Sequence, residues 1–196
     1  GADVDEVTRI IGRDSRIGSK YLKGGLGYGG PCFPRDNIAF ARFAESVGVK
    51  AELPIVVHQT NLSQVKRVIK RLGQLNLKPG TKIGILGLSY KPDTPVVEES
   101  QSIMLAKELS SLGYVVHVYD PLALEEARKV LGDTVIYYKT LDDCVKNVDV
   151  IVLATPWKLF KTIDPKGKII IDCWRLLRDR EDLKKNNQYI PLGMYR

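Results

Sequence analysis

Apolar side chains recur at helical spacing in the first third of the chain and form short continuous runs in the rest. In the first part the apolar positions lie mostly three, four or seven residues apart, as on the buried face of an amphipathic helix. They are Val4, Val7, Ile10, Ile11, Ile55, Leu62, Val65, Ile69 and Leu72. The pattern predicts helices over residues 3–12 and 54–73, and a third from about Asp36 to Val47 that Gly48 ends.

Beyond the turn at 76–80, apolar runs of strand length alternate with helix-like segments. Strands are predicted at 82–88, 115–120, 134–138, 149–154 and 168–172, and helices at 101–112, 124–131 and 141–145. Apolar strands that alternate with helices are typical of parallel sheets covered on both faces. The predicted fold class is therefore α/β, with a helical segment at 1–76 followed by a Rossmann-like, doubly wound parallel sheet of about five strands at 77–196.

The spacing within residues 54–73 is close to that of a coiled-coil seam. This helix is therefore expected to pack along a partner helix, and a subunit interface of a homodimer is one place for such packing. His58 and Gln59 fall near the seam. A histidine in this setting is read as a core or interface residue rather than as a ligand.

One stretch, from Gly24 to Asp36, stands out by its residue types and reads GGLGYGGPCFPRD. Its glycines let the backbone approach a ligand closely or take positive φ, and its prolines stiffen the turn around Cys32. A cysteine just before a helix lies where backbone N–H groups and the helix dipole favour a thiolate. Cys32 is therefore a candidate nucleophile, although a single cysteine is more often a small buried apolar residue. Asp36 belongs either to this site or to an ordinary first helical turn.

Three glycines between Gly25 and Gly30 match the dinucleotide-binding pattern G-x-G-x-x-G, but the context of the match is wrong. No apolar strand precedes them, and two prolines interrupt the helix that should follow. The first predicted strand of the sheet contains Gly84 and Gly87, but no third glycine follows to complete the pattern. The sheet is therefore a poor candidate for ordinary NAD binding, yet it could hold a nucleotide with Lys91 as a point charge on a phosphate.

Ligands of doubly wound sheets bind outside the carboxyl ends of the strands. Those ends carry Ser89-Tyr90-Lys91, Asp120-Pro121, Thr155-Pro156-Trp157 and Cys173-Trp174-Arg175.

The composition is that of an ordinary globular protein, with 44% hydrophobic and 27% charged residues. No apolar run approaches the roughly 20 residues of a membrane span, and no secretory segment opens the chain, so no membrane partner and a cytoplasmic location are expected. The net charge of +7 favours anionic partners. Because the basic residues are dispersed without interleaved aromatic residues, a phosphorylated small molecule is expected rather than nucleic acid. The three cysteines show neither zinc-site nor disulfide spacing, so no metal is expected.

Several motifs together resemble the family of NAD-dependent nucleotide-sugar dehydrogenases, which act on substrates such as UDP-glucose. The first runs from Asp14 through Tyr21-Leu22-Lys23, and the second from Gly27 to Asp36. The others are the segment 87–94, which reads GLSYKPDT, then Tyr119-Asp120-Pro121 and Asp172-Cys173-Trp174-Arg175. They span nearly the whole chain in the order of the family.

The resemblance implies that residues 1–76 are the end of a central dimerisation region that carries a catalytic cysteine, and that 77–196 are a UDP-sugar-binding domain. It also implies that the domain that mainly binds the cofactor NAD is missing, which agrees with a first residue, Gly1, that is not methionine. The context of Cys32 favours UDP-glucose as substrate. UDP-N-acetylmannosamine and GDP-mannose remain the alternatives.

Carried over by position, Cys32 would be the nucleophile and Asp36 would position or activate the hydrolytic water. Arg16 would reach a substrate bound in a neighbouring subunit. The other expected substrate-binding residues are Tyr21, Leu22, Lys23, Gly27, Tyr28, Gly29, Gly30, Tyr90, Lys91 and Arg175. Two departures from the family pattern are Arg35, where lysine is commoner, and Glu98, where relatives have an arginine that reaches the cofactor. No cofactor contact is therefore assigned to Glu98.

Two further classes of function stay open on the sequence. The chain as it stands could only bind a uridine nucleotide and dimerise, without turnover. A thiol hydrolase or peroxidase that uses Cys32 is disfavoured, because such a hydrolase needs a histidine base and His58 and His117 lie within regular elements.

Overall fold

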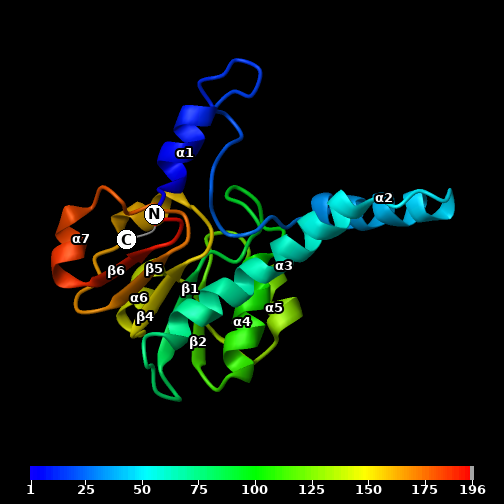
Figure 1. Cartoon of the computed structure of the whole chain (residues 1–196). Coiled ribbons are helices and arrows are strands. Elements are labelled where there is room, and N and C mark those ends of the chain that lie inside the picture. Colours follow the sequence, from blue (N-terminus) through cyan, green and yellow to red (C-terminus); the bar gives the residue numbers. More distant parts are fainter. Residues whose placement is uncertain (195–196) are drawn as a thin grey trace.

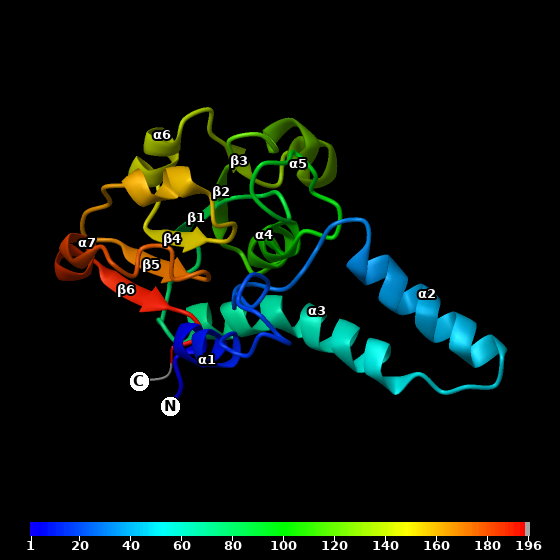
Figure 2. The same cartoon turned by 90° about the horizontal axis from the view of Figure 1, so that it is seen from above.

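The computed structural model describes residues 1–194 and forms an α/β body with a helical arm that projects from it (Figures 1 and 2). The helices are α1 (Val4–Ile11), α2 (Phe33–Ser46), α3 (Glu52–Gly73), α4 (Gln101–Ser111), α5 (Leu124–Leu131), α6 (Leu141–Lys146), the 3₁₀ helix η1 (Lys158–Thr162) and α7 (Glu181–Asn186). The strands are β1 (Lys82–Leu86), β2 (Val115–Tyr119), β3 (Ile136–Tyr137), β4 (Val150–Leu153), β5 (Ile169–Asp172) and β6 (Gln188–Pro191).

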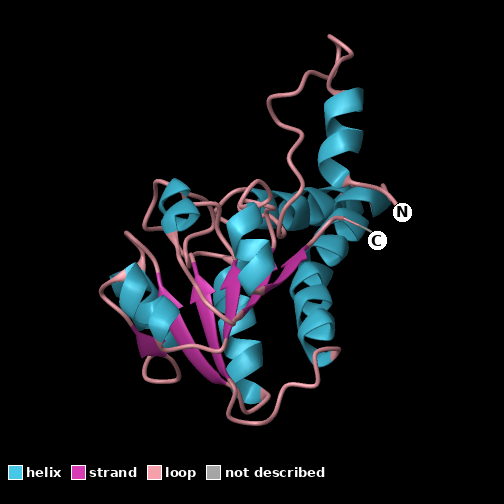
Figure 3. Ribbon diagram, turned by 90° about the vertical axis from the view of Figure 1, so that its left-hand side faces the viewer, coloured by secondary structure: helices cyan, strands magenta, loops and turns pink. Residues whose placement is uncertain are grey.

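The six strands form one parallel sheet in the order β3-β2-β1-β4-β5-β6, with helices on both faces (Figure 3). Strand β4 is buried along its whole length because both faces of the sheet are covered. One apolar core joins the strands to α3, α4 and α5, and a second joins them to α6, η1 and α7. The predicted α/β fold class is confirmed.

Helix α3 belongs to both the body and the arm (Figure 2). Its second half packs on α4 and the core through Val65, Val68 and Leu72, which are at most 4% exposed. Its first half leaves the body and packs against α2, which runs out along the arm before the chain returns. Along the chain, Cys32 at the start of α2 is therefore connected to the sheet by α2, the turn at 47–51 and α3.

The arm carries many apolar side chains on its surface. Those at least 39% exposed are Phe33, Ile38, Phe40, Phe43, Val47, Val49, Leu53, Ile55, Val56, Val57 and Leu62. The second half of the predicted seam of residues 54–73 is therefore buried within the chain, whereas the apolar side chains of its first half are exposed.

The structure differs from the sequence prediction at four elements, one of which is the 3₁₀ helix η1, a segment for which no helix was predicted. The sheet has six strands rather than about five, because β6 adds to the edge beyond β5. Helix α7, which precedes β6, was not predicted either. Helix α2 begins at Phe33 rather than near Asp36, because Pro34 lies in the first turn, where no helical partner exists for the N–H that proline lacks.

Helix α1 packs beside the carboxyl-terminal part of the sheet, and the loop that follows it extends away from the body before the chain returns toward the arm (Figure 1). Val4 N–H donates to the carbonyl of Gly193 at 2.9 Å. Within residues 1–194, no helix combines the length and the hydropathy that crossing a membrane requires.

Candidate functional site

Cys32 occupies the N-cap position of α2, where the glycine-rich stretch meets the arm. Its side chain is exposed and makes no capping hydrogen bond, so the sulfur is accessible. Asp36 lies one turn further on, and its N–H donates to the carbonyl of Cys32 at 2.8 Å. The two side chains predicted to be catalytic therefore share the first turn of one helix.

The carboxylate of Asp36 is open to solvent, and within residues 1–194 its ion-pair partner is the neighbouring Arg35. Nε of Arg35 lies 3.1 Å from Oδ1 of Asp36, and both side chains are more than 60% exposed. A pair this exposed contributes little to stability. Asp36 is therefore free to contact a ligand or a water molecule beside Cys32.

The glycine segment, residues 24–30, is held against the body at three places, and the first is its beginning. Nη2 of Arg175 donates to the carbonyl of Gly24 at 2.6 Å. The next residue, Gly25, lies on the ring of Trp174, where an added Cβ would come within 2.3 Å of a ring carbon. Only glycine allows this approach.

The middle of the segment is held by α3 and α4. The backbone N–H of Tyr28 donates to Oδ1 of Asn61 at 2.7 Å, and the Tyr28 carbonyl accepts from Nδ2 of Asn61 at 2.9 Å. Nε2 of Gln101 donates to the same Tyr28 carbonyl at 3.4 Å. The phenol oxygen of Tyr28 accepts from Nδ2 of Asn37 at 3.1 Å, which ties the segment to α2.

The end of the segment packs on the loop that follows β1. Gly30 N–H donates to the carbonyl of Glu98 at 2.9 Å. Gly30 has φ +82° and lies against the Tyr90 ring, where an added Cβ would come within 2.7 Å. Gly29 is equally close to the carbonyl oxygen of Glu99, at 2.4 Å from an added Cβ. Five predicted site residues, Gly27, Tyr28, Gly29, Gly30 and Tyr90, thus lie in one continuous region.

Other predicted site residues lie at the surface. Arg16 is on the loop after α1, where Nη2 lies 2.6 Å from Oδ2 of Asp14 and 86% of its side chain is exposed. Tyr21 is 83% exposed, Leu22 is half-buried, and Lys23 is exposed. Lys91 is exposed, with Nζ 5.4 Å from the centre of the Tyr90 ring. Their expected contacts with substrate stay predictions.

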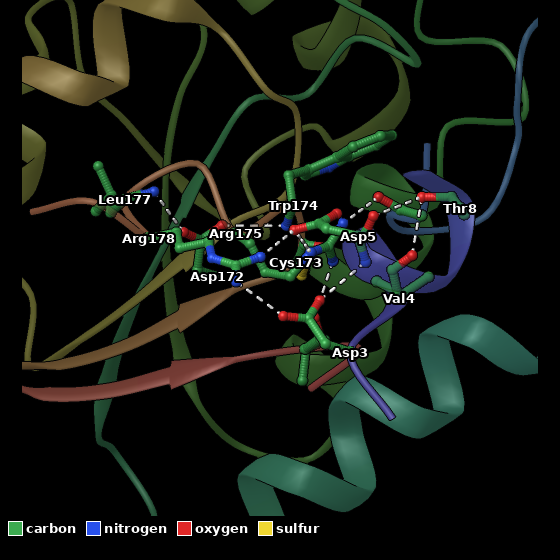
Figure 4. Close-up of polar contacts among 12 residues, drawn as sticks. Asp3, Val4, Asp5, Thr8, Asp172, Cys173, Trp174, Arg175, Leu177 and Arg178 are labelled. Carbon is green, nitrogen blue, oxygen red and sulfur yellow. Dashed lines mark hydrogen bonds and ion pairs between the residues drawn. The ribbon is translucent and has the colours of Figure 1, made fainter. Parts of the chain in front are cut away.

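Arg175 is buried, and its donors are already used within the chain (Figure 4). Nε donates to Asp5 at 2.8 Å, and Nη1 to the carbonyl of Leu192 at 2.8 Å. Nη2 holds Gly24, as described above. Arg178 adds ion pairs with Asp3 and Asp5 at 2.9 and 3.2 Å. The expected contact of Arg175 with substrate stays a prediction, and the bonds present join α1, the glycine segment and the end of β6.

Asp120, at the carboxyl end of β2, organises the strand ends from within. Oδ2 accepts from the N–H groups of Leu88 and Ser89 at 2.7 and 3.1 Å. It also accepts from the indole N–H of Trp157 at 3.3 Å, and Oδ1 caps the turn at Leu122 and Ala123. Because Asp120 is 1% exposed and fully bonded, its role is to shape the loops around the site.

The loop after β1 does not fit NAD in the usual manner. Gly87 has φ +95° and packs on Thr155, so that an added Cβ would lie within 2.4 Å of that side chain. The next helix, α4, starts only at Gln101, so no helix N-terminus follows the glycine to receive a pyrophosphate. Within residues 1–194, no cluster of three or more His, Cys, Asp or Glu side chains has the arrangement of a metal site.

Two grooves line the arm. One of about 640 Å³ lies between α2 and α3 and includes His58, Asn37 and Gln59. The other, of about 380 Å³, runs between the glycine segment and α3 and includes Gly27, Tyr28 and Asn61. The second groove is next to the region formed by the predicted site residues.

Asn61 and Gln101 are the functional candidates that the motifs did not reveal. A signal for Asn61 exists in the sequence, because it occupies the same helical stripe as Val65, Val68 and Leu72. A polar residue at a buried position needs a hydrogen-bonding partner. The sequence does not indicate that the partner is the peptide of Tyr28.

Comparison with known proteins gives the same assignment for both parts of the chain. The model of the UDP-glucose/GDP-mannose dehydrogenase family, central domain, matches residues 1–63, and that of the family's UDP binding domain matches residues 84–179. UDP-glucose 6-dehydrogenase YwqF of Bacillus subtilis is 40% identical over 158 residues, which are 80% of this chain and 36% of that protein. UDP-glucose 6-dehydrogenase of Rickettsia conorii is 34% identical over 196 residues, which cover 94% of this chain and 45% of that protein.

Solved structures agree with the sequence relatives. A UDP-glucose dehydrogenase from the hyperthermophilic archaeon Pyrobaculum islandicum superposes on all of this chain with a TM-score of 0.90, at 34% identity and over 44% of its own length. A GDP-mannose dehydrogenase from Pseudomonas aeruginosa superposes on 88% of this chain with a TM-score of 0.71, at 28% identity and over 42% of its length. The chain thus spans less than half the length of each of these relatives.

Proposed function

The chain belongs to the UDP-glucose/GDP-mannose dehydrogenase family, and we propose that it is the central and UDP-binding part of a UDP-glucose 6-dehydrogenase. The proposed reaction oxidises the alcohol at carbon 6 of UDP-glucose to the carboxylate of UDP-glucuronate. The relatives named as UDP-glucose 6-dehydrogenases support this choice of substrate.

The observation that carries the proposal is the position of Cys32. It is an exposed cysteine at the start of α2, and it directly follows a glycine segment that packs on the loop after β1. That loop leaves the carboxyl edge of the parallel sheet, where ligands of such folds bind. A nucleotide at this edge would therefore present its sugar toward the cysteine.

In the proposed mechanism the sulfur of Cys32 is the covalent catalyst. The thiolate adds to the aldehyde carbon of the first oxidation product and forms a thiohemiacetal, which becomes a thioester in the second oxidation. Asp36, one turn away, takes a proton from the water molecule that attacks the thioester. Hydrolysis releases the carboxylate product and regenerates the thiolate.

The remaining predicted site residues would bind the nucleotide sugar. The glycine segment and Tyr90 would form the wall of the site, and Lys91 would place its charge on a phosphate. Arg16, on its extended loop, would act on a substrate held by a second subunit, together with Tyr21-Leu22-Lys23. Arg175, whose donors are used within the chain, would serve the substrate site by holding the start of this wall at Gly24.

NAD would supply the oxidising power, and two NAD molecules bound in turn would each accept one of the two hydrides that leave carbon 6. Because the loop after β1 does not fit NAD in the usual manner, we propose that another part of the whole protein holds the cofactor. The 196 residues alone are then expected to bind UDP without turnover. The same reasoning keeps a second function open, a nucleotide-binding module that only dimerises.

The proposed homodimer would form through the outer half of α3. Leu53, Val56 and Val57 are exposed there beside Ile55 and Leu62, so that apolar area is available for a partner. The predicted seam over residues 54–73 supports this placement.

Replacement of Cys32 tests the catalytic proposal. In the whole protein with NAD and UDP-glucose, Cys32→Ser is expected to abolish formation of UDP-glucuronate, because an alcohol is a far weaker nucleophile than a thiolate. Cys144→Ala is the matched control, since Cys144 is buried in the second core away from the site. Product formation by Cys32→Ser at the normal rate would exclude Cys32 as nucleophile.

Calorimetry of this chain with UDP tests the binding proposal separately. A measurable heat with UDP is expected, and no binding at millimolar ligand would contradict it. Parallel titrations with UDP-glucose, UDP-N-acetylmannosamine and GDP-mannose distinguish the alternative substrates, because GDP-mannose differs in the base and UDP-N-acetylmannosamine in the sugar.

A further inference from the structure

Asn61 is a polar residue on the buried stripe of α3, and only 5% of it is exposed. Its side-chain amide faces the peptide group of Tyr28. Nδ2 donates to the Tyr28 carbonyl at 2.9 Å, and Oδ1 accepts from the Tyr28 N–H at 2.7 Å. Both polar atoms of this side chain are therefore used on the backbone of one residue, Tyr28, which lies 33 positions earlier in the sequence.

The fit around this pair leaves no room for a side chain at Gly27. An added Cβ at Gly27 would lie 2.3 Å from Oδ1 of Asn61. Gln101 also reaches the Tyr28 carbonyl, but at 3.4 Å, and its own Oε1 is buried without a hydrogen-bond partner among the described residues. Asn61 therefore makes the stronger hold on this peptide.

The held peptide is connected to the helix that carries the cysteine. The phenol oxygen of Tyr28 accepts from Nδ2 of Asn37 in α2, and its ring centre lies 5.7 Å from that of Phe33, the residue after Cys32. A shift of the Tyr28 peptide would therefore move the first turn of α2 relative to the sheet. Asn61 is thus linked to the start of α2 by direct contacts, first with Tyr28 and then from Tyr28 to Asn37 and Phe33.

We infer that Asn61 is a positioning residue, which fixes the Tyr28 peptide and thereby sets where Cys32 stands relative to a bound sugar nucleotide. The inference rests on the proposed function, since it needs a sugar nucleotide at the carboxyl edge of the sheet. Asn61 does not take part in the bond changes. Its loss is expected to release the glycine segment and displace the sulfur from the sugar, while the loops at the carboxyl edge of the sheet, which would hold UDP, stay in place.

The test compares two properties of this chain, the affinity for UDP and the protection of Cys32 by UDP-glucose. Protection is the factor by which saturating UDP-glucose slows alkylation of Cys32 by iodoacetamide. In Asn61→Ala the UDP affinity from calorimetry is expected to stay within about threefold of wild type. The protection factor is expected to fall at least about tenfold, because alanine removes both hydrogen bonds of Asn61 to Tyr28.

Asn187→Ala is the matched control. Asn187 is also a side-chain amide that bonds backbone groups on both sides, accepting from Lys168 N–H at 3.0 Å and donating to the carbonyl of Pro165 at 2.9 Å. It lies beside β6, outside the site. Its removal is expected to lower stability similarly and to leave protection of Cys32 unchanged.

A second variant guards against failure of Asn61→Ala to fold. Asn61→Asp has nearly the same shape, keeps an acceptor for the Tyr28 N–H and loses the donor to the Tyr28 carbonyl. Its protection factor is expected to fall as well. Amide exchange of Tyr28, followed by mass spectrometry of peptides from residues 24–33, is expected to speed up in both Asn61 variants.

The outcomes separate this inference from the proposed function. Full protection of Cys32 in the Asn61 variants overturns the positioning role and leaves the proposed function standing. An equal loss of protection in Asn187→Ala has the same consequence. If the wild-type chain binds UDP and UDP-glucose gives no protection, the placement of the sugar at Cys32 is wrong. The positioning role then falls together with that part of the proposed function.

Discussion

Nε of Arg175 donates to the carboxylate of Asp5 at 2.8 Å, so one hydrogen bond joins residues 170 positions apart in the sequence. The Arg175 side chain is only 3% exposed, whereas that of Asp5 is 38% exposed. Removing the carboxylate leaves a buried guanidinium without one of its acceptors. The pair therefore links docking of α1 to the turn that holds the start of the glycine segment.

Asp5→Asn is expected to lower the free energy of unfolding by about 1 kcal/mol, because the partly exposed carboxylate is screened by solvent. Urea denaturation at pH 7 measures the change. Glu6→Gln is the control, since Glu6 is exposed and its ion pair in the described part of the chain is a long one, with Arg9 at 3.9 Å. An equal loss of stability in both variants would contradict a specific role for Asp5.

The same pair predicts a dependence on pH. Burial alone would raise the pKa of Asp5, but the hydrogen bonds and charges of Arg175 and Arg178 outweigh it and lower the pKa below its usual 3.8. A carboxyl with a lowered pKa stabilises the fold above its unfolded pKa, and this contribution is lost as the pH falls through the folded value. The stability difference between wild type and Asp5→Asn should therefore be complete at pH 6 and shrink below about pH 4.

The three cysteines are expected to react very differently with iodoacetamide. Cys32 is exposed, whereas burial raises the pKa of the Cys144 thiol to about 12 and also raises that of Cys173. Because only the thiolate is alkylated, the native chain should take up one label, at Cys32. Mass spectrometry should find three labels after denaturation and none in native Cys32→Ser. Native labelling of Cys144 or Cys173 would contradict the packing of β5 and α6.

His117, in the buried part of β2, is expected to make the fold sensitive to mild acid. Burial lowers its pKa, the charge of Lys82 lowers it further, and Asp149 opposes the shift in part. Its ring stacks on Tyr138, with Nδ1 3.1 Å from the phenol oxygen, while Nε2 is buried without a partner among the described residues. Protonation would therefore place a charge where the fold does not accommodate one.

The direction of the effect follows from the lowered pKa. Below about pH 6.5 the unfolded chain binds a proton at His117 that the folded chain resists, so stability falls as the pH is lowered. His117→Phe keeps the stacking on Tyr138 and removes the titration. Urea midpoints measured from pH 8 to pH 5 should decline less steeply for the variant than for wild type. Parallel declines would show that His117 is not responsible.

The central strands β1, β2, β4 and β5 could be predicted because strands buried on both faces of a sheet need a short continuous run of apolar residues. β4, for example, is buried along its whole length. β6 has no such run, since it lies at the edge of the sheet, and Ile190 is its one residue that the structure shows as buried. Its Pro191 also counts against a strand, although proline is tolerated at an edge.

The candidate site was predictable only where the signal lies in a continuous motif. Cys32 and the glycines could be identified from neighbouring residue types. The hold of Asn61 on Tyr28 could not, because it joins positions 33 residues apart through a contact that exists only after α3 packs on the body. For Arg175 the motif identified the residue as functional, but it did not reveal that its donors bond Asp5, Gly24 and Leu192 within the chain.

The outer half of α3 gives a prediction about assembly. Ile55 and Leu62 lie seven residues apart, on one side of the helix, and are 44% and 40% exposed. Side chains of this kind recur along the arm, far more than the scattered apolar residues of an ordinary surface. If the arm pairs with that of a second copy, burying these two side chains contributes to the dimer, and charges placed there oppose it.

Ile55→Lys combined with Leu62→Lys is therefore expected to convert a dimer into a monomer, because two buried lysines on each chain lack partners in the interface. Sedimentation velocity at micromolar concentration distinguishes twice the chain mass from the chain mass. Leu112→Lys with Val130→Lys is the control, since these residues are 54% and 45% exposed on the body. The control should remain dimeric with unchanged affinity for UDP. If the wild-type chain sediments as a monomer, or if the doubly substituted variant still dimerises, the outer half of α3 is excluded as the dimer interface.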